Sequence, residues 1–573
     1  KKRIYGEIKF AIGNARNATR GRFETTEKVR EKSDKNIKSI PAYSIIKLAQ
    51  PNNTRGGMLF MLVETTVKQG SFYNVLYQMI PDNHILKRID SAIDLSFVNE
   101  LLADRYCKNF GRPAKEPEMM LRIQILKYLY NLSDEQLIQD LSVNLAYKWF
   151  VGLNPEDPLP ETSLLTKFRT QRLKDISMDA IITEIVRQCI ERGIIKGSNG
   201  IVIDTTHIEA NTIKKVPERI MKQLARNIFK AMGQEEYEIP DYTQIEDHVA
   251  AKQIMKDYLE DLIEQVSKES SEEVIQAVQE AQEILESDLF IEQKGIRSLV
   301  DKDARVGHKT KTQNFYGYKA EICQTTNGSL ITSITIEPGS YVDGSNFKEH
   351  LEETQKSGLT VTGVYGDKAY FRPDILNLIK ENQATSYIPV SASAYKIDEK
   401  LFSYNKDSDQ WFCVMGNETV KIKSKTRERN GKKQKYLDYT FEREFCRNCP
   451  RRSECIGKSK RIAKLMTISI NTPELYEYSQ RAKTSDFVEE YRKRAKIEPK
   501  NAELKRFHGL DRAKGYGLRS IRIQAKLTAL SVNLKRIAKL VSALKGLHVL
   551  ILKLLSPLVV NRPDCDWVAA QAA

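Results

Sequence analysis

Residues 200–204 read Gly-Ile-Val-Ile-Asp, a short run of apolar and mostly β-branched side chains that ends on the carboxylate of Asp204. A continuous apolar run of this length is typical of a strand that is buried on both faces. A second apolar run, residues 359–365, also stops just before an acid, Asp367. Because neighbouring parallel strands present their carboxyl ends to one crevice, we expect Asp204 and Asp367 to lie close together, although acids at strand ends are common.

The segments around these two runs predict a mixed α/β chain. Residues 317–322 and 331–336 read as strands and flank a Thr-Asn-Gly turn, so they predict a β-hairpin. Residues 82–192 have a helical pattern, with a Ser-x-x-Gln capping box at Ser133 and basic residues at 167–174. Short helices with tight turns are typical of a helix-turn-helix-like DNA binder, and also of a helical bundle with a solvated basic face.

The composition indicates a folded chain of two to four domains with a polyanionic partner. The 573 residues are 41% hydrophobic and 29% charged, and their net charge is +16. A basic surplus favours nucleic acid because lysine and arginine displace counterions from phosphates. Residues 233–290 hold 17 acidic and 3 basic side chains, which leaves +30 on the remainder. We expect this acidic segment to form a helical hairpin that avoids DNA and takes part in a protein contact.

The terminal residues and the cysteines indicate the cellular compartment in which the protein is expected to act. The first thirty residues are charged and lack an apolar core, so no signal peptide is expected. Residues 547–560 are apolar, but the run is shorter than a membrane span and contains Lys553 and Pro557. Eight cysteines do not form a disulfide scaffold in a chain of this length, and a reducing cytoplasm fits them best. Residues 1–57, ahead of Met58, are either a vector or read-through extension or a basic arm.

A third acid, Glu498, lies within a helical pattern over residues 484–508. The spacing Tyr491-x2-Arg494-x3-Glu498-x6-Lys505 places four side chains on one face of a helix. An acid between cations and a phenol suits a surface that holds a metal ion beside DNA phosphates, whereas an exposed helix with ordinary ion pairs has the same composition. Carboxylates of this kind bind Mg²⁺ or Mn²⁺, and two such ions can activate a hydroxyl and stabilise the leaving oxygen of a phosphodiester.

Together, these blocks resemble those of the bacterial insertion-sequence DDE transposases. The Tyr-x2-Arg-x3-Glu-x6-Lys spacing is similar to the family signature, and residues 203–206 and 365–370 resemble its two aspartate blocks. The resemblance implies a ribonuclease H-like catalytic core preceded by a helical DNA-binding domain. It also implies roles for individual residues: Asp204, Asp367 and Glu498 as catalytic ligands of Mg²⁺ or Mn²⁺, and Tyr491, Arg494 and Lys505 as DNA contacts.

A cysteine-rich insert is similar to that of one branch of the family. Cys446-x2-Cys449-x5-Cys455 lies downstream of Cys413, and four thiolates could form a tetrahedral structural Zn²⁺ site. The insert has few long apolar runs, so a metal could replace a hydrophobic core. Residues 414–416, however, read Val-Met-Gly where the resemblance leads us to expect a Cys-Pro-x-Gly turn, and unliganded thiols are the alternative.

We therefore predict an α/β protein with the following segments: a basic extension (1–57), a helical DNA-binding domain (58–195), a ribonuclease H-like DDE catalytic domain (196–546) with a helical insert (213–300) and a cysteine-rich insert (395–465), and a C-terminal tail (547–573). His207 is expected to be structural, and Asp301 and Asp303 to belong to a loop before the second strand. The chain contains no phosphate-binding glycine loop with a lysine, no nucleophilic serine elbow and no dinucleotide fingerprint.

The function that these predictions favour is transposition. The enzyme would cut double-stranded DNA at the element ends and join those ends to target DNA, as a homodimer assembled on DNA in the bacterial cytoplasm, associated with the nucleoid. Two alternatives remain open from the sequence: a DNA-binding protein that derives from a transposase but has lost transposition, and a metal-dependent nuclease that cuts without joining.

Overall fold

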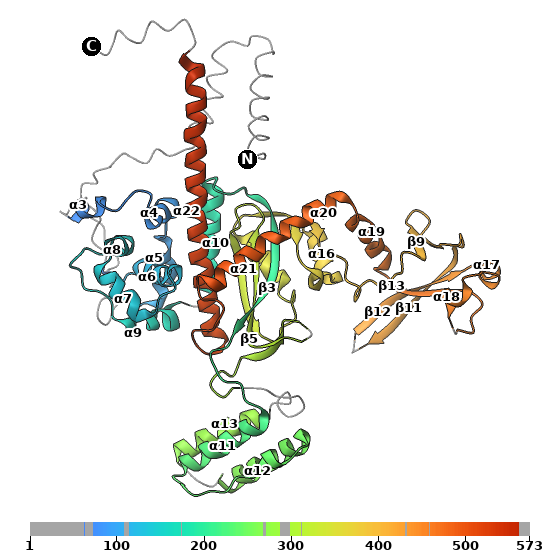
Figure 1. Cartoon of the computed structure of the whole chain (residues 1–573), viewed down its shortest axis with the longest axis horizontal. Coiled ribbons are helices and arrows are strands. Elements are labelled where there is room, and N and C mark those ends of the chain that lie inside the picture. Colours follow the sequence, from blue (N-terminus) through green and yellow to red (C-terminus); the bar gives the residue numbers. More distant parts are fainter. Residues whose placement is uncertain are drawn as a thin grey trace. The chain divides into compact units, whose positions relative to one another are not determined.

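The computed structural model describes residues 62–63, 73–107, 114–173, 175–266, 271–286, 298–310, 312–429, 432–457 and 459–560 (Figure 1). The chain divides into residues 1–60 and residues 61–573, and all described elements belong to the second unit. The predicted extension at 1–57 lies outside the described residues. No helix within the described ranges combines the length and the apolar character that crossing a membrane requires.

A six-stranded mixed sheet carries both predicted aspartate strands. Its strands are β3 (Ser198–Glu209), β4 (Arg305–His308), β5 (Asn314–Thr325), β6 (Ile331–Pro338), β7 (Thr360–Tyr365) and β8 (Thr385–Tyr387). The order is β4-β5-β3-β7-β8, with β6 also paired to β5. β5 is antiparallel to β3, β4 and β6, whereas β7 is parallel to both β3 and β8. This mixed α/β arrangement is consistent with the ribonuclease H-like core that the resemblance implies.

The apolar run of β3 is buried on both faces, as its sequence predicts. Ile201 and Ile203 belong to one hydrophobic cluster, and Val202 between them belongs to another. Alternate side chains of a strand point to opposite faces, so both faces of the sheet are covered here. From Asp204 onward the strand is only partly buried, and this change leaves the carboxylate at the boundary of the core.

Helices form most of the chain before the sheet. They are α3 (Tyr73–Gln78), α4 (Ile85–Ala92), α5 (Phe97–Leu102), α6 (Pro117–Leu129), α7 (Asp134–Val143), α8 (Leu145–Val151), α9 (Thr162–Lys167) and α10 (Asp175–Glu191), with the short turns η1 (Ala103–Arg105) and η2 (Phe168–Arg172) and a two-residue strand pair, β1 (Leu62–Val63) with β2 (Ala114–Lys115). The predicted cap at Ser133 is present, because its hydroxyl accepts a 3.0 Å hydrogen bond from the amide of Gln136.

Both inserts contain hydrophobic clusters of their own. The helical insert at 213–300 contains α11 (Pro217–Ala231), η3 (Tyr242–Gln244), α12 (His248–Val266) and α13 (Glu272–Leu285). The acidic residues 233–290 contribute the last two helices, and α11 packs with them in one cluster. The cysteine-rich segment contains β9 (Phe402–Asn405), β10 (Gln410–Cys413), β11 (Thr419–Arg429), β12 (Lys432–Phe441), α17 (Arg443–Arg447), α18 (Arg452–Ile456) and β13 (Leu465–Ser469). Its cluster is built around Trp411 and Tyr439, which are fully buried. The expectation that this insert lacks an apolar core was wrong, because its aromatic residues come from alternate strand positions and not from long runs.

The remaining helices are α15 (Phe347–Lys356), η4 (Lys368–Tyr370), α16 (Pro373–Glu381), α19 (Thr472–Ala482), α20 (Ser485–Tyr491), η5 (Arg492–Lys496), α21 (Ile497–Arg506) and α22 (Gly517–Val560). The pattern over 484–508 is therefore three pieces and not one helix. Pro499 explains the interruption, because a proline ring clashes with the carbonyl four residues earlier and is tolerated only in a first turn. In α21 it occupies the third position.

The long helix α22 joins two hydrophobic clusters. Ile523, Leu527 and Leu530 on one face pack in the cluster that contains the N-terminal helices, and Ile521 and Ala525 pack in the cluster on the other side of the sheet. A helix that is apolar on several faces is buried on several sides. α22 also continues to Val560, beyond residue 546, where we placed the end of the catalytic domain.

Candidate active site

Asp204 lies within β3, and Asp367 lies two residues beyond the end of the neighbouring parallel strand β7. Val202 of β3 is in register with Tyr365 of β7, and each aspartate follows its partner by two residues. Asp367 caps the turn η4, and its carboxylate accepts a 2.8 Å hydrogen bond from the amide of Ala369. The charge of Asp367 contributes to the raised pKa of Asp204.

The carboxylate of Asp204 is largely buried, with 16% of the side chain exposed. Burial raises its pKa to about 6; Arg494 opposes this shift, and Asp367 and Asp343 add to it. One carboxylate oxygen accepts a 3.0 Å hydrogen bond from the amide of Asn501, and the other lies 3.4 Å from Arg494. Burial and neighbouring acids therefore disfavour the ionised form of Asp204, and the positive charge of Arg494 favours it.

Glu498 is brought to the same place by the helical segment that contains it. Arg494 lies between the two acids, with one guanidinium nitrogen 3.4 Å from Asp204 and another 3.3 Å from Glu498. Ile497 and Leu504 anchor α21 in the core, so Glu498 in the first turn stays at the surface with 66% of its side chain exposed. The phenol of Tyr365 donates a 2.6 Å hydrogen bond to Glu490, which docks α20 on the end of β7.

Tyr491 and Lys505 lie at the two ends of this constellation. Burial raises the pKa of the Tyr491 phenol, Arg494 lowers it, and all three acids raise it further. Lys505 lies 3.2 Å from the ring of His207, three residues beyond Asp204 on β3. Burial and the charge of Lys505 lower the pKa of His207 to about 4, so its ring is neutral at physiological pH and can accept from the lysine.

Two further residues of the site have no signal in the sequence blocks. Asn501 bonds Asp204, and its own amide oxygen is buried and has no hydrogen-bond partner among the described residues. It lies three residues after Glu498 and four before Lys505, which is the helical spacing that could have revealed it. Asp343 acts on Asp204 from a different loop and is held by a 2.8 Å ion pair with Lys319, and only the fold brings it here.

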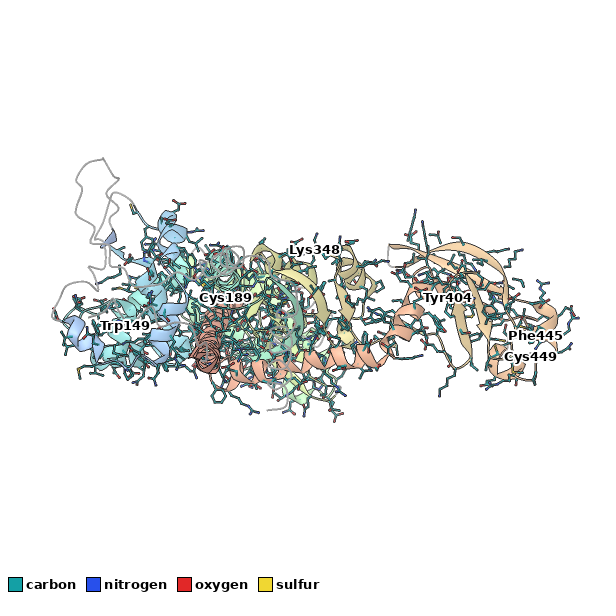
Figure 2. All side chains as sticks on the ribbon, turned by 90° about the horizontal axis from the view of Figure 1, so that it is seen from above. Trp149, Cys189, Lys348, Tyr404, Phe445 and Cys449 are labelled. Atoms are coloured by element: carbon teal, nitrogen blue, oxygen red, sulfur yellow. The ribbon has the colours of Figure 1, made fainter. Side chains whose placement is uncertain are left out.

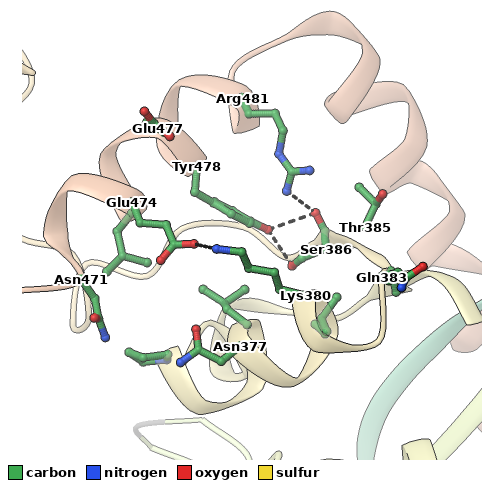
Figure 3. A pocket seen from close by; sticks show the side chains of 15 residues that line it. Asn377, Lys380, Gln383, Thr385, Ser386, Asn471, Glu474, Glu477, Tyr478 and Arg481 are labelled. Atoms are coloured by element: carbon green, nitrogen blue, oxygen red, sulfur yellow. Dashed lines mark hydrogen bonds and ion pairs between the residues drawn. The ribbon is translucent and has the colours of Figure 1, made fainter. Parts of the chain in front are cut away.

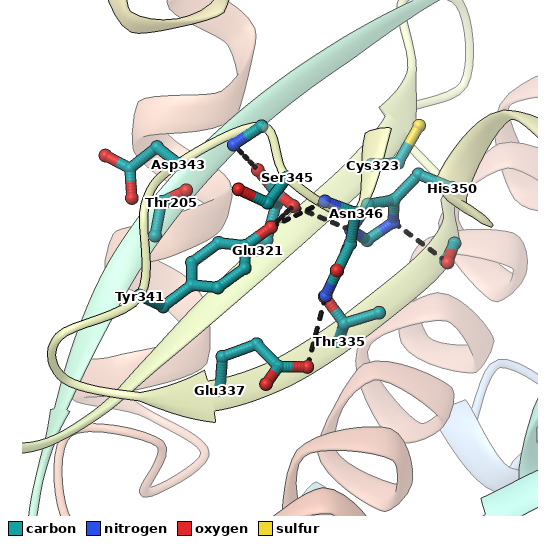
Figure 4. Close-up of polar contacts among 12 residues, drawn as sticks. Thr205, Glu321, Cys323, Thr335, Glu337, Tyr341, Asp343, Ser345, Asn346 and His350 are labelled. Carbon is teal, nitrogen blue, oxygen red and sulfur yellow. Dashed lines mark hydrogen bonds and ion pairs between the residues drawn. The ribbon is translucent and has the colours of Figure 1, made fainter. Parts of the chain in front are cut away.

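A buried polar network supports both aspartate blocks (Figure 4). Its centre is Glu321, which is 1% exposed and accepts 2.7 Å hydrogen bonds from the hydroxyls of Tyr341 and Tyr370. The hydroxyl of Tyr370 also lies 3.1 Å from that of Thr205. Tyr370 belongs to the turn after Asp367, and Thr205 follows Asp204. This one phenol therefore ties Thr205 in β3 to the turn after Asp367. Burial raises the pKa of Glu321, but His350, followed by Tyr370 and Tyr341, lowers it further than burial raises it.

The four cysteines of the insert line one small cavity of about 20 Å³. Figure 2 shows Cys449 beside Phe445, which lines the same cavity. Burial raises the pKa of Cys455; Lys464 lowers it, and the other three thiols raise it again. The amide of Asn417 lies 3.1 Å from the sulfur of Cys446. Gly416, with φ of +85°, closes a tight turn by donating to the carbonyl of Cys413, so the turn forms without the expected sequence.

Two other features have structural roles. In a cavity of about 490 Å³ between α16 and α19, Tyr478 and Arg481 bond the backbone carbonyl of Ser386 and so cover the outer edge of β8 (Figure 3). Asp301 and Asp303 accept from the amides of Gly517 and Leu518, at 3.3 and 2.8 Å, and thereby cap α22. Both acids lie in a loop before β4, as predicted, and from there they anchor the start of α22.

The donors of the site suit a divalent cation, although their arrangement is not that of a closed metal site. Within the described ranges, no three Asp, Glu, His or Cys side chains are gathered closely enough to hold a metal ion. The guanidinium of Arg494 lies between the carboxylates of Asp204 and Glu498 and supplies positive charge there. Carboxylate oxygens, and the partnerless amide oxygen of Asn501, are the ligands that Mg²⁺ and Mn²⁺ prefer. The residues present therefore fit such an ion in chemistry.

Comparison with known protein families gives two matches. Residues 74–171 match a family described as a transposase domain (DUF772), and residues 412–538 match a transposase DDE domain. The second match includes Glu498, all four clustered cysteines and the first half of α22, whereas Asp204 and Asp367 lie before it. No curated protein matches the chain.

Proposed function

Because the chain belongs to the insertion-sequence DDE transposases, we propose that it cuts DNA at the ends of its element and joins them to a target. The observation that carries this proposal is that Asp204 and Asp367 each follow, by two residues, a residue of the register pair Val202–Tyr365, while Arg494 links Asp204 to Glu498. Three acids that approach from three separate segments are costly to hold together, because like charges disfavour ionisation. Such an arrangement is expected at a functional site.

Asp204, Asp367 and Glu498 would hold Mg²⁺ or Mn²⁺, and the oxygen of Asn501 is available beside them. When bound, a pair of these ions supplies Lewis acidity that favours a hydroxyl nucleophile and an oxyanion leaving group. Arg494, displaced from the acids, would donate to a DNA phosphate, and Lys505 and Tyr491 would contact the backbone on either side. Asn501 would keep the carboxylate of Asp204 in one orientation.

In the reaction, water attacks the phosphodiester at each element end and releases a 3′-hydroxyl. That hydroxyl then attacks a target phosphodiester in line, so one P–O bond forms as another breaks and no covalent protein intermediate arises. Two ends must meet in one complex, so we propose a homodimer on double-stranded DNA, acting in the bacterial cytoplasm at the nucleoid.

The test is strand cleavage and transfer on labelled element-end DNA with a target plasmid and Mg²⁺ or Mn²⁺. Asp204→Asn, Asp367→Asn and Glu498→Gln should each bind the DNA with affinity close to the parent and neither cut nor join it. If one of these variants is fully active, the acid that it replaces is not a catalytic residue. A parent that binds without cutting supports the alternative of a transposase-derived DNA-binding protein, and one that cuts without joining is a nuclease.

We also propose a structural Zn²⁺ at Cys413, Cys446, Cys449 and Cys455, because all four line one cavity near the size of a single ion. Small rotations of the side chains would be needed to bring the sulfurs together. The purified chain should contain about one zinc by elemental analysis. Cys446→Ser with Cys449→Ser should lose it, whereas the exposed Cys107→Ser should retain it. A parent without zinc that melts unchanged in chelator would leave these cysteines as reduced thiols.

A further inference from the structure

A cavity of about 410 Å³ lies apart from the carboxylates, between the N-terminal helices and the start of α22. One wall is formed by residues of α6, α7, α9 and η2, and the other by residues 514–524. Every residue of its lining falls in one of the two family-matched segments, 74–171 or 412–538. The cavity is therefore built jointly by both transposase domains.

The walls carry a surplus of positive charge. Lys127 and Arg169 line one wall and share the single acid of the cavity, Asp134, at 2.7 and 2.9 Å. Lys514 and Arg519 line the other wall and bond only neutral oxygens in the described contacts, those of Asn131 and Thr170. Burial lowers the pKa of Lys514, and Lys127 lowers it further, while Asp134 and Asp511 act in the opposite direction without cancelling the shift. An anion between the two walls would relieve this repulsion.

The shape and lining suit a phosphate that is part of a chain. A volume of several hundred Å³ exceeds what a single small anion fills and suits a nucleotide unit. The ring of Tyr516 is half exposed at the same cavity, where it can lie against a sugar or a base. Gln524, buried in α22, holds the loop before it by bonding the carbonyls of Gly509 and Arg512 and the amide of Lys514. The backbone that carries Lys514 is thus fixed in place.

β3 connects the cavity to the carboxylates. The strand continues from Asp204 to Glu209, whose backbone pairs with Asp511 and Ala513 at 2.9 and 2.8 Å, directly before Lys514. Five strand residues span about 17 Å, the length of about five base pairs of B-form DNA. Lys505 lies between the two ends beside His207. DNA that leaves the carboxylates in this direction would pass a series of cations.

We propose that this cavity binds a backbone phosphate of the DNA duplex about five base pairs from the scissile bond, an inference that rests on the proposed function. Lys514 and Arg519 supply the principal donors. Since each wall comes from a different matched domain, one phosphate would join the helical domain and the catalytic core on the same stretch of DNA.

The experiment measures binding of the full chain to labelled random-sequence duplex DNA at several salt concentrations, without divalent metal. Lys514→Gln with Arg519→Gln should weaken binding about tenfold and reduce the log–log salt slope by about 1, because one phosphate contact contributes about 0.9. Lys348→Gln with Lys356→Gln on α15 removes the same charge at exposed positions and should change neither quantity appreciably. The charge-retaining pair Lys514→Arg with Arg519→Lys should restore the slope.

The remaining outcomes separate the two proposals. If the glutamine pair in the cavity and the glutamine pair on α15 have equal effects, the proposed phosphate site in the cavity is wrong, whereas the proposal that the chain binds DNA still holds. Inorganic phosphate could stabilise the parent but not the cavity variant, at constant ionic strength, without competing with DNA. That result would show that the cavity binds a free anion, and it would overturn the proposal that it binds a DNA backbone phosphate. A parent that binds no duplex would overturn the proposed function itself. On element-end DNA, a neutral methylphosphonate near the fifth base pair should weaken the parent and not the variant.

Discussion

Arg494 is bonded to Asp204 across 290 residues of sequence, and the same guanidinium reaches Glu498 on its own helical segment. The cation thus stands where three acids would otherwise repel one another. The pair stabilises the site in the absence of DNA and metal, and it also opposes metal binding, since the guanidinium occupies the carboxylates that a metal needs.

Arg494→Gln should therefore increase the affinity of the DNA-free chain for Mn²⁺ by about three- to tenfold, or about 1 kcal/mol at the order of magnitude expected for one partly exposed ion pair. Isothermal titration at pH 8 measures this, well above the pKa of Asp204. Arg492→Gln, at an exposed neighbouring position, is the matched control for net charge. Equal affinities of the two variants would show that Arg494 does not compete with the metal. Cleavage should still be lost in Arg494→Gln, because its phosphate contact is gone.

Asp204→Asn should raise stability at pH 8 and leave it unchanged near pH 4. The folded pKa of about 6 lies above the ordinary aspartate pKa of 3.8, so the stability that the protonated acid contributes is fully present below about pH 4 and is lost as the pH rises through 6. The ionised form costs about 3 kcal/mol at the upper limit. Thermal unfolding of parent and variant at both pH values tests this. A less stable variant at pH 8 would mean that the ion pair with Arg494 outweighs burial.

Tyr370→Phe should slow cleavage more than Tyr341→Phe. Both hydroxyls donate to Glu321 at 2.7 Å, so each variant should lose a similar stability, about 2 kcal/mol. Only the hydroxyl of Tyr370 also reaches Thr205, next to Asp204. Single-turnover cleavage rates, together with unfolding midpoints, separate the two effects. If the two variants cleave at equal rates and are equally stable, the hydrogen bonds around Glu321 contribute to folding and not to cleavage.

DNA affinity should fall as the pH rises from 7 to 9, and Lys505→Arg should abolish that fall. Burial, followed by the charge of Lys309, lowers the pKa of Lys505 to about 8. The protonated lysine binds phosphate, so binding weakens above pH 8 as the free protein loses this proton. Arginine stays charged throughout this range. Fluorescence anisotropy at constant salt gives the affinities, and a parent with no such dependence would exclude Lys505 from the DNA contact.

The strands and the acids could be read from the sequence because each depends on local pattern. An apolar run that ends in an acid predicts a strand that stops there. β7 ends at Tyr365, two residues before Asp367, whereas β3 continues past Asp204 to Glu209. The capping box at Ser133 is equally local. The chemical roles of the acids and cysteines stay predictions, whereas the family itself is confirmed by the two domain matches.

What the sequence could not supply depends on distant contacts. Asp343 and Glu321 reach the aspartate blocks through a loop and a neighbouring strand, and no spacing rule connects them to Asp204. Pro499 could have indicated a break in the helical pattern over 484–508. The spacing of Tyr491 and Glu498 on one face, however, fits a continuous helix equally well. The short helical piece η5 interrupts the longer pattern and carries Arg494, whose guanidinium bonds Asp204 from there.

The two faces of α22 have an evolutionary consequence. Because Leu527 and Ala525 pack in different clusters, neither matched domain can be exchanged with that of a relative without a mismatch along this helix. New DNA preferences would then have to arise through substitutions at exposed positions of an intact chain. Lineages of this protein should diversify by gradual surface drift, with α22 changing only when residues on both sides of it change together.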